Sequence, residues 1–230
     1  MVIATITTTT NTGPTTIPTT DADLLKLVQW LSPAFPVGGY AYSHGLEAAI
    51  SEGRVSDAAT LQQWLATVLG HGSGRADAVL LCVAMAPDAD HAALAELAAA
   101  LAASSERWTE TIDQGHAFTE AQNALSGNAF SPAPLPVAVG RAAAALALPA
   151  ERVAALYLHA FASTLVSGAV RFIPLGQTDG QRVLAALHPL IEAVAQEAAQ
   201  TDPDHIATSA FGADLAAMRH EGLEVRIFRT

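Results

Sequence analysis

The chain has one cysteine and one lysine among its 230 residues, and half as many basic as acidic side chains. Cys82 cannot form an intrachain disulfide, so we expect it to pack in the core of a protein from a reducing compartment. Lys26 follows no glycine-rich loop, which excludes an autonomous P-loop GTPase or ATPase. Eleven basic residues against twenty-two acidic ones leave a net charge of −11. That charge argues against nucleic acid or an anionic membrane as the main partner.

Catalytic motifs are absent as well. Gly72 and Gly74 lack the third glycine and the preceding strand of a dinucleotide site, and no G-x-S-x-G occurs. Acidic pairs such as Glu47 with Glu52 are expected on solvated faces. We therefore predict no catalytic residue, no cofactor and no enzyme activity.

The eight histidines are scattered, and none pairs with another at i and i+4, so no local metal site is evident. His159 lies in an apolar helix, where a hydrogen-bonded core histidine is expected rather than a ligand. His44 and His220 stay undecided. A metal or small-molecule site assembled only in the fold therefore stays open as an alternative.

Apolar residues make up 51% of the chain and charged residues only 14%, with a mean hydropathy of +0.31. Such a composition predicts a globular core rather than disorder. Residues 1–22 are rich in threonine without lysine or arginine, and are predicted to be a disordered leader and no secretory signal. We expect one domain over residues 23–217 and a C-terminal tail over 218–230.

Helical periodicity dominates after the leader, and strand signals are weak. The predicted fold is all-α, a single compact bundle of roughly eight to ten helices. The expected helices cover residues 23–31, 56–70, 77–86, 92–103, 104–125, 137–148, 153–170 and 178–194.

Several helix boundaries carry their own signals. Ser56 is a plausible N-cap and Gly70 a plausible C′ residue, while Thr178 and Gln181 have the spacing of a capping box. Pro189 is expected to bend the last helix, and residues 131–136 to form a loop. The uncharged stretch 153–170 contains too many polar residues for a membrane span, so we expect it at the bundle centre with neighbours on all sides.

Three segments depart from the Ala/Leu-rich background. The first is SPAFPVGGYAYSHGLE, residues 32–47, where Gly38 and Gly39 precede two tyrosines, Tyr40 and Tyr42. Its composition suits either protein recognition or a turn whose tyrosines cover the core. The second segment, residues 170–182, contains Arg171, Gly176, Gln177, Thr178, Asp179, Gly180 and Gln181. A glycine early in a helix is unfavourable by about 1 kcal/mol against alanine, so Gly180 indicates a close approach by another helix or chain.

The third segment is MRHEGLEVRIFRT, residues 218–230, which ends the chain. It combines His220, Glu221, Arg226, Ile227, Phe228 and Arg229. Arginine beside large apolar residues is typical of interface anchors. No intramolecular partner for this tail is evident in the sequence.

The three segments, in this order, resemble the urease accessory protein UreF family. The matching patterns are SPxFPVGGYxYSxGLE, PLGQTDGQR and MRHE followed by an arginine and aromatic tail. The tail departs slightly, since it ends IFRT and carries Gly222, Glu224 and Val225 where polar or aromatic residues are common.

The resemblance implies a cytoplasmic, non-enzymatic maturation factor, a chaperone that dimerises and joins UreD, also called UreH, to the GTPase UreG. The complex would deliver nickel to apo-urease, with regulation of the GTPase as a further role. Tyr40 and Arg226 match positions linked to partner docking. We expect Tyr40, Tyr42 and the tail to form one docking patch, with the 176–181 turn supporting it. Arg226 or Arg171 acting in trans on the GTPase is a further alternative.

Overall fold

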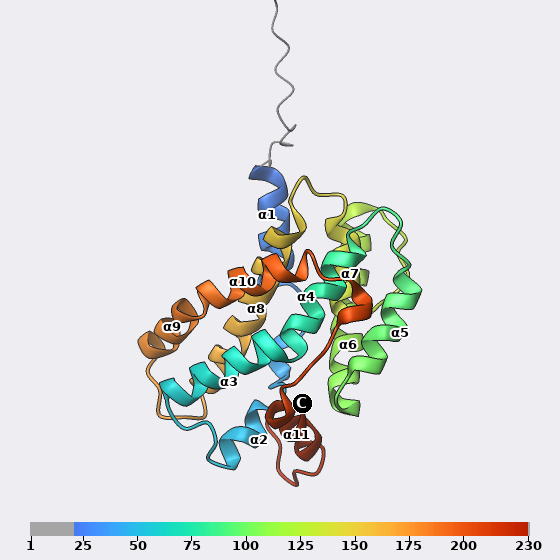
Figure 1. Ribbon diagram of the computed structural model, residues 1–230. Helices are drawn as coiled ribbons and strands as arrows, with labels where there is room; N and C mark the ends of the chain where they lie inside the picture. The colour runs from blue at the N-terminus through green and yellow to red at the C-terminus, as the bar shows by residue number, and fades with distance from the viewer. Residues whose placement is uncertain (1–20, 230) are drawn as a thin grey trace, which may run out of the picture.

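The computed structural model describes residues 21–229, so nearly all of the predicted leader lies outside the described residues. Within them the chain is helical throughout and contains no strand, which confirms the all-α class. Nine of the α-helices have ten or more residues, in agreement with the expected eight to ten. The elements in chain order are α1 Asp21–Trp30, η1 Gly39–Ala41, α2 Leu46–Ser51, α3 Ala58–His71, α4 Ser73–Ala84, α5 His91–Leu101, α6 Ser105–Ser126, α7 Leu135–Ala143, α8 Ala150–Ala169, α9 Gln177–Ala186, α10 His188–Ala198, η2 Pro203–His205 and α11 Phe211–His220 (Figure 1).

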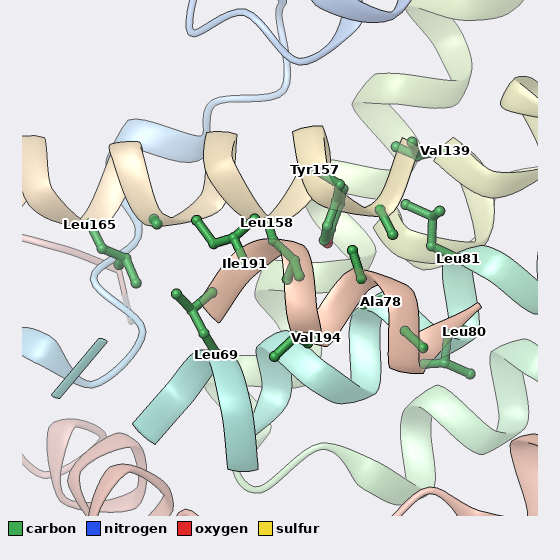
Figure 2. Packing of buried hydrophobic residues seen from close by; sticks show 14 of the residues in the cluster. Leu69, Ala78, Leu80, Leu81, Val139, Tyr157, Leu158, Leu165, Ile191 and Val194 are labelled. Atoms are coloured by element: carbon green, nitrogen blue, oxygen red, sulfur yellow. The ribbon is translucent and has the colours of Figure 1, made fainter. Parts of the chain in front are cut away.

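The core lies where α3, α4, α8 and α10 pack against one another. Leu158 of α8, Ile191 of α10 and Leu69 of α3 point into the same apolar interior and are almost completely buried (Figure 2). Burial of such side chains contributes about 1.5–3 kcal/mol each and is the main force that holds the bundle together. Cys82 belongs to this core, and burial raises the pKa of its thiol to about 12, as expected for a packing residue.

Helix α8 is less enclosed than the sequence predicts. It packs against α4, α9 and α10, but Ser163, Thr164 and Ser167 on its other side line a cavity rather than a neighbouring helix. The expectation of neighbours on all sides is therefore wrong on that side, because the segment between α1 and α2 leaves space over α8. No helix in residues 21–229 is both long and apolar enough to cross a membrane.

The start of α3 lies one residue later than Ser56. Asp57 is the N-cap: its carboxylate accepts the Thr60 N–H at 2.8 Å, and the Thr60 hydroxyl accepts the Asp57 N–H at 3.0 Å. This reciprocal pair satisfies two otherwise unpaired helix-end donors. The predicted end at Gly70 is also wrong, since α3 continues to His71.

The expected capping box at Thr178 and Gln181 is absent. Helix α9 begins at Gln177 after Gly176, which provides no side-chain cap, so Thr178 and Gln181 lie exposed in its first turns. Pro189 does more than bend the chain, because α9 ends at Ala186 and a separate helix begins at His188. A proline is well accommodated in a first turn, where its missing N–H has no intrahelical partner to lose.

Gly180 allows a close helix contact. A Cβ atom placed there would lie 2.7 Å from Cγ2 of Val170 and 3.1 Å from Cγ1 of Val166. The close approach predicted for this glycine is thus made by α8 of the same chain.

The predicted loop over residues 131–136 ends earlier than expected. Helix α7 begins at Leu135 with Pro136 in its first turn, and it ends at Ala143 rather than near residue 148.

Candidate functional site

The C-terminal tail folds back onto the protein. Helix α11 packs against α2 at the end of the bundle opposite α1 (Figure 1). Beyond α11 the chain returns across the N-terminal turns of α2 and α6. The expectation that the tail lacks an intramolecular partner is therefore wrong.

His220, at the end of α11, is completely buried between two carboxylates. Its Nδ1 lies 2.7 Å from Oε2 of Glu106, and its Nε2 lies 3.1 Å from Oε2 of Glu47. A doubly protonated imidazole donates from both nitrogens, and this geometry accommodates that form. Glu106 also lies in the first turn of α6, where the helix dipole favours negative charge. We call Glu47, Glu106 and His220 the tail clamp.

The tail clamp holds the backbone of the tail directly. Glu47 accepts the Ile227 N–H at 2.9 Å and the Phe228 N–H at 3.0 Å, and Glu106 pairs with the guanidinium of Arg226. Burial alone would raise the pKa of Glu47, but the hydrogen bonds from Phe228, His220 and Ile227 outweigh it and lower that pKa. The ionised carboxylate is thus the form that binds the tail, and Glu47 is not the solvated residue that the sequence predicted.

Three further contacts fix the ends of the tail segment. The Arg229 N–H donates to the Ala41 carbonyl at 2.8 Å, and the Phe228 ring packs edge-on against Phe172 with centroids 5.1 Å apart. At the other end, Glu221 accepts the Ser105 hydroxyl at 2.7 Å, and hydrogen bonds to Ser105 and the start of α6 lower the pKa of Glu221. The tail is therefore docked at both of its ends.

The two tyrosines of the first segment have different environments. Tyr40 is 71% exposed, whereas Tyr42 is buried, and its hydroxyl donates to Oδ2 of Asp113 at 3.2 Å. Burial raises the pKa of Tyr42, although Arg229 opposes that rise. Tyr42 therefore packs beneath the exposed surface of the first segment and does not form part of that surface. The exposed apolar side chains of this region are those of Tyr40, Val225 at 83% and Ile227 at 66%.

The second segment reaches the tail through the end of α8. Gly180 packs on Val166 and Val170, and Gly168, between them on α8, lies under the Phe228 ring. Arg171 is exposed and lines the same cavity as Tyr40 and Tyr42. The remaining members of the segment, Gly176, Gln177, Thr178, Asp179 and Gln181, lie at the exposed start of α9.

A second polar network lies inside the bundle beside the tail clamp. Arg107 of α6 donates to Oδ2 of Asp77 at 2.8 Å, and the Tyr157 hydroxyl donates to the same oxygen at 3.0 Å. Burial raises the pKa of Asp77 and of Tyr157. Burial would lower the pKa of Arg107, but the charges of Asp77 and Glu110 outweigh it, so Arg107 keeps its proton.

Glu110 and His44 extend this network toward the first segment. Glu110 accepts the Gln114 amide at 3.2 Å, and its Oε2 lies 3.4 Å from Nδ1 of His44, while Nε2 of His44 contacts the Ser73 hydroxyl. His44 has φ 57°, a left-handed conformation that is unfavourable for a residue with a Cβ atom. We call Asp77, Arg107, Tyr157, Glu110 and His44 the core network.

A cavity of about 250 Å³ lies between the 32–42 segment, α6 and α8. Its walls are mostly apolar, but Glu110 and Tyr157 of the core network and Tyr42 line it as well. Ionisable groups thus converge on an interior space that the sequence did not reveal. No group of three or more histidine, cysteine or acidic side chains in residues 21–229 is arranged to hold a metal ion.

Comparison with known proteins places these features in a family. The UreF family model matches residues 55–188, more than half of the chain. A curated relative from Cereibacter sphaeroides, named urease accessory protein UreF, is 61% identical over 91% of this chain and 99% of its own length. The chain belongs to the UreF family. Relatives of the same name from Jannaschia sp. and Paracoccus denitrificans are 54% and 52% identical, over 90% and 92% of this chain and 94% and 98% of their own lengths.

Sequence reasoning identified the UreF motifs but missed the groups that organise them. Glu47 is the last residue of the first motif and His220 lies near the start of the third, yet they are 173 residues apart. Glu106, Arg107 and Asp77 lie outside all three motifs. Charged residues in an otherwise alanine-rich helix were the one available signal, and that signal does not identify the partner of each charge.

Proposed function

We propose that this UreF-family chain is a non-catalytic adaptor in urease maturation. It joins UreD/UreH and the GTPase UreG in a cytoplasmic complex that delivers nickel to apo-urease. The observation that carries this proposal is the docked tail, because the tail clamp holds residues 226–228 while Val225 and Ile227 stay exposed. The hydrogen bond from the Arg229 N–H to the Ala41 carbonyl brings the end of the tail next to the exposed Tyr40. Exposed large apolar residues with arginine nearby are typical of partner-docking surfaces.

The docking surface is tested with Arg226→Ala in the full chain. The variant should recover less UreD/UreH in a pull-down from cells that express the accessory proteins, and it should keep the circular dichroism spectrum and unfolding midpoint of the wild type. Arg226 is partly exposed outside the core, so its truncation has little effect on the bundle. Arg182→Ala is the matched control, since that side chain is exposed on α9 and pairs only locally with Asp179.

Normal assembly of the Arg226 variant, seen as an unchanged complex by size-exclusion chromatography, contradicts the proposed docking role. Tyr40→Ala gives a second test of the same surface, because Tyr40 is exposed and its loss leaves no buried group unpaired. We further propose that the chain acts as a homodimer and regulates the GTPase. The first is measured by light scattering, and the second by GTP hydrolysis with and without the chain.

The cavity favours a second candidate function. A half-open cavity of about 250 Å³ with a carboxylate and three phenols in its walls could hold a small polar ligand or ion. Nickel titration of the isolated chain and an assay for turnover without UreG distinguish the adaptor function from the ligand-binding function. Turnover by the purified chain would contradict the adaptor proposal, and its absence together with intact pull-downs would support it.

A further inference from the structure

The cavity between α6 and α8 has an apolar interior and a polar mouth. Trp30 and Phe118 in its walls are almost completely buried, and Phe161 is half-buried. Tyr40 and Arg171 also line the cavity but are exposed, so they mark the side on which it opens to solvent. An apolar cavity of about 150 Å³ holds a benzene molecule, so a volume of about 250 Å³ is sufficient for an aromatic ring with a short chain.

Helix α8 and the turn after it place a row of polar groups along one wall of the cavity. Ser163, Ser167 and Arg171 are four residues apart, a spacing that brings helical side chains onto one face. The Arg171 N–H donates to the Gly168 carbonyl at 3.0 Å, so the helical turn continues to the arginine. Within residues 21–229 none of the three side chains has a hydrogen-bond or ion-pair partner. They are therefore available to a ligand.

The carboxylate in the walls of the cavity is, in contrast, already paired. Glu110 accepts the Gln114 amide at 3.2 Å, and its Oε2 lies 3.9 Å from the Arg107 guanidinium and 3.4 Å from Nδ1 of His44. Glu110 is also buried, whereas Arg171 is exposed at the mouth. The described walls thus provide an unpaired cation at the mouth and a neutralised anion inside, a pattern that favours an anionic head group over a cationic one.

We propose that this cavity binds a small organic carboxylate with an aromatic or aliphatic body. The body lies among Trp30, Phe118 and Phe161, and the carboxylate faces Arg171 and the Ser167 hydroxyl. A guanidinium can donate two parallel N–H···O bonds to a carboxylate. Burial of the apolar body supplies most of the affinity, and the arginine selects the charge of the head group. This proposal rests on the ligand-binding function suggested above for the cavity and names its class of ligand.

The test is calorimetric titration of the full chain at neutral pH with 3-phenylpropionate, 3-phenylpropan-1-ol and 3-phenylpropylamine. The three probes share the ring and the chain, so they bury the same apolar surface and differ in the charge of the head group. One phenylpropionate should bind per chain. The alcohol should bind about fivefold more weakly, which is the most that a solvent-exposed ion pair usually contributes, and the amine should bind more weakly still.

Two variants locate the ligand. Arg171→Gln should weaken phenylpropionate binding by about the same fivefold and leave the alcohol unaffected. Arg152→Gln is the matched control, because it removes an exposed arginine at the opposite end of α8, and it should bind all three probes as the wild type does. Ala160→Leu puts a larger side chain into the cavity wall and should weaken binding of all three probes. Circular dichroism checks that each variant is folded.

Equal binding of phenylpropionate and the amine, or undiminished phenylpropionate binding by the Arg171 variant, would overturn the proposal. If the alcohol binds as tightly as the carboxylate, the cavity keeps its ligand-binding function and the assigned head-group charge is wrong. No saturable heat with any probe in the wild type would reject the ligand-binding function together with this proposal. The adaptor function is tested separately by the pull-downs and does not depend on either result.

Discussion

The core network and the tail clamp are built from the same kinds of group, yet they differ in what holds them. Helix α6 supplies Glu106 to the tail clamp and, in the next turn, Arg107 and Glu110 to the core network. Every member of the core network comes from the interior of the bundle or from the segment packed on it. In the tail clamp, by contrast, Glu47 and Glu106 bind the last residues of the chain. We expect the core network to open only when the bundle unfolds. The tail, in contrast, is expected to detach from the tail clamp while the bundle stays folded.

The largest expected effect is on the core network. Arg107→Met should lower the free energy of unfolding by about 3–5 kcal/mol, because it removes the guanidinium that pairs with the buried Asp77 carboxylate. Urea denaturation measures the loss. Arg152→Met, at an exposed position on α8, is the control and should stay within about 0.5 kcal/mol of the wild type. A loss below about 1 kcal/mol for Arg107→Met would mean that the core network does not stabilise the bundle.

A smaller loss is expected at the centre of the tail clamp. His220→Leu removes the donor between Glu47 and Glu106 and should lower the free energy of unfolding by about 1–3 kcal/mol. Hydrogen exchange should show faster exchange of the tail amides as well. His205→Leu replaces an exposed ring and provides the control. If the tail amides of the variant stay as protected as in the wild type, His220 does not hold the tail in place.

Glu47→Gln should affect the tail with little change in the bundle. The amide side chain keeps the size of the residue but has one acceptor oxygen in place of two, so its NH2 group faces one of the Ile227 and Phe228 N–H donors. A hydrogen bond to a charged group contributes about 1.5–3 kcal/mol and a neutral one about 0.5–1.5 kcal/mol, so the two amides should exchange at least roughly tenfold faster. Glu120→Gln, at an exposed position on α6, is the matched control. An equal effect of both substitutions on tail exchange would contradict the clamp.

A fall in pH should loosen the tail before the bundle, and this is the smallest of the expected effects. The pKa of Glu47 is lower in the docked state than its ordinary value of 4.5, so Glu47 binds a proton more readily when the tail is undocked. Tail protection is therefore complete above pH 4.5 and is lost as the pH falls through the lowered pKa. The pKa of Asp77 is raised by burial, so its contribution to stability has the opposite sign and is lost as the pH rises. Hydrogen exchange followed from pH 6 to well below pH 4.5 should show the tail amides losing protection before those of α4, and simultaneous loss would refute the difference.

The accuracy of the sequence predictions follows the range of the interactions involved. The long helix α6 was expected over residues 104–125 and occupies Ser105–Ser126, because its cap and its apolar positions are local features. The start of α3 was misplaced by one residue because Ser56 and Asp57 are both good caps and only the backbone geometry distinguishes them. The capping box expected at Thr178 failed because α9 begins earlier, beside the close contact of Gly180 with α8.

The structure bears only on the juxtaposition within the predicted docking patch, and the docking role of the patch stays a prediction. The first segment and the tail do lie side by side, as the Arg229 to Ala41 hydrogen bond shows. Composition alone could not distinguish an exposed Tyr40 from a buried Tyr42 two residues later. That difference depends on Asp113, which lies on another helix and is invisible in the local pattern.

The three motifs by themselves determined which family this protein belongs to. The sequence also determined that the protein is helical and where most of its long helices lie. These properties depend on intrinsic propensity and on apolar periodicity over a few turns, both of which neighbouring residues encode. The tertiary structure alone decided that His220 faces Glu47 and Glu106, that Arg107 is paired inside the bundle and that His159 meets His188. Each of these pairings joins residues at least 29 positions apart, which no local pattern specifies. For His220 and Arg107 the free energy that selects the partner comes from burying polar and charged groups that must then be paired.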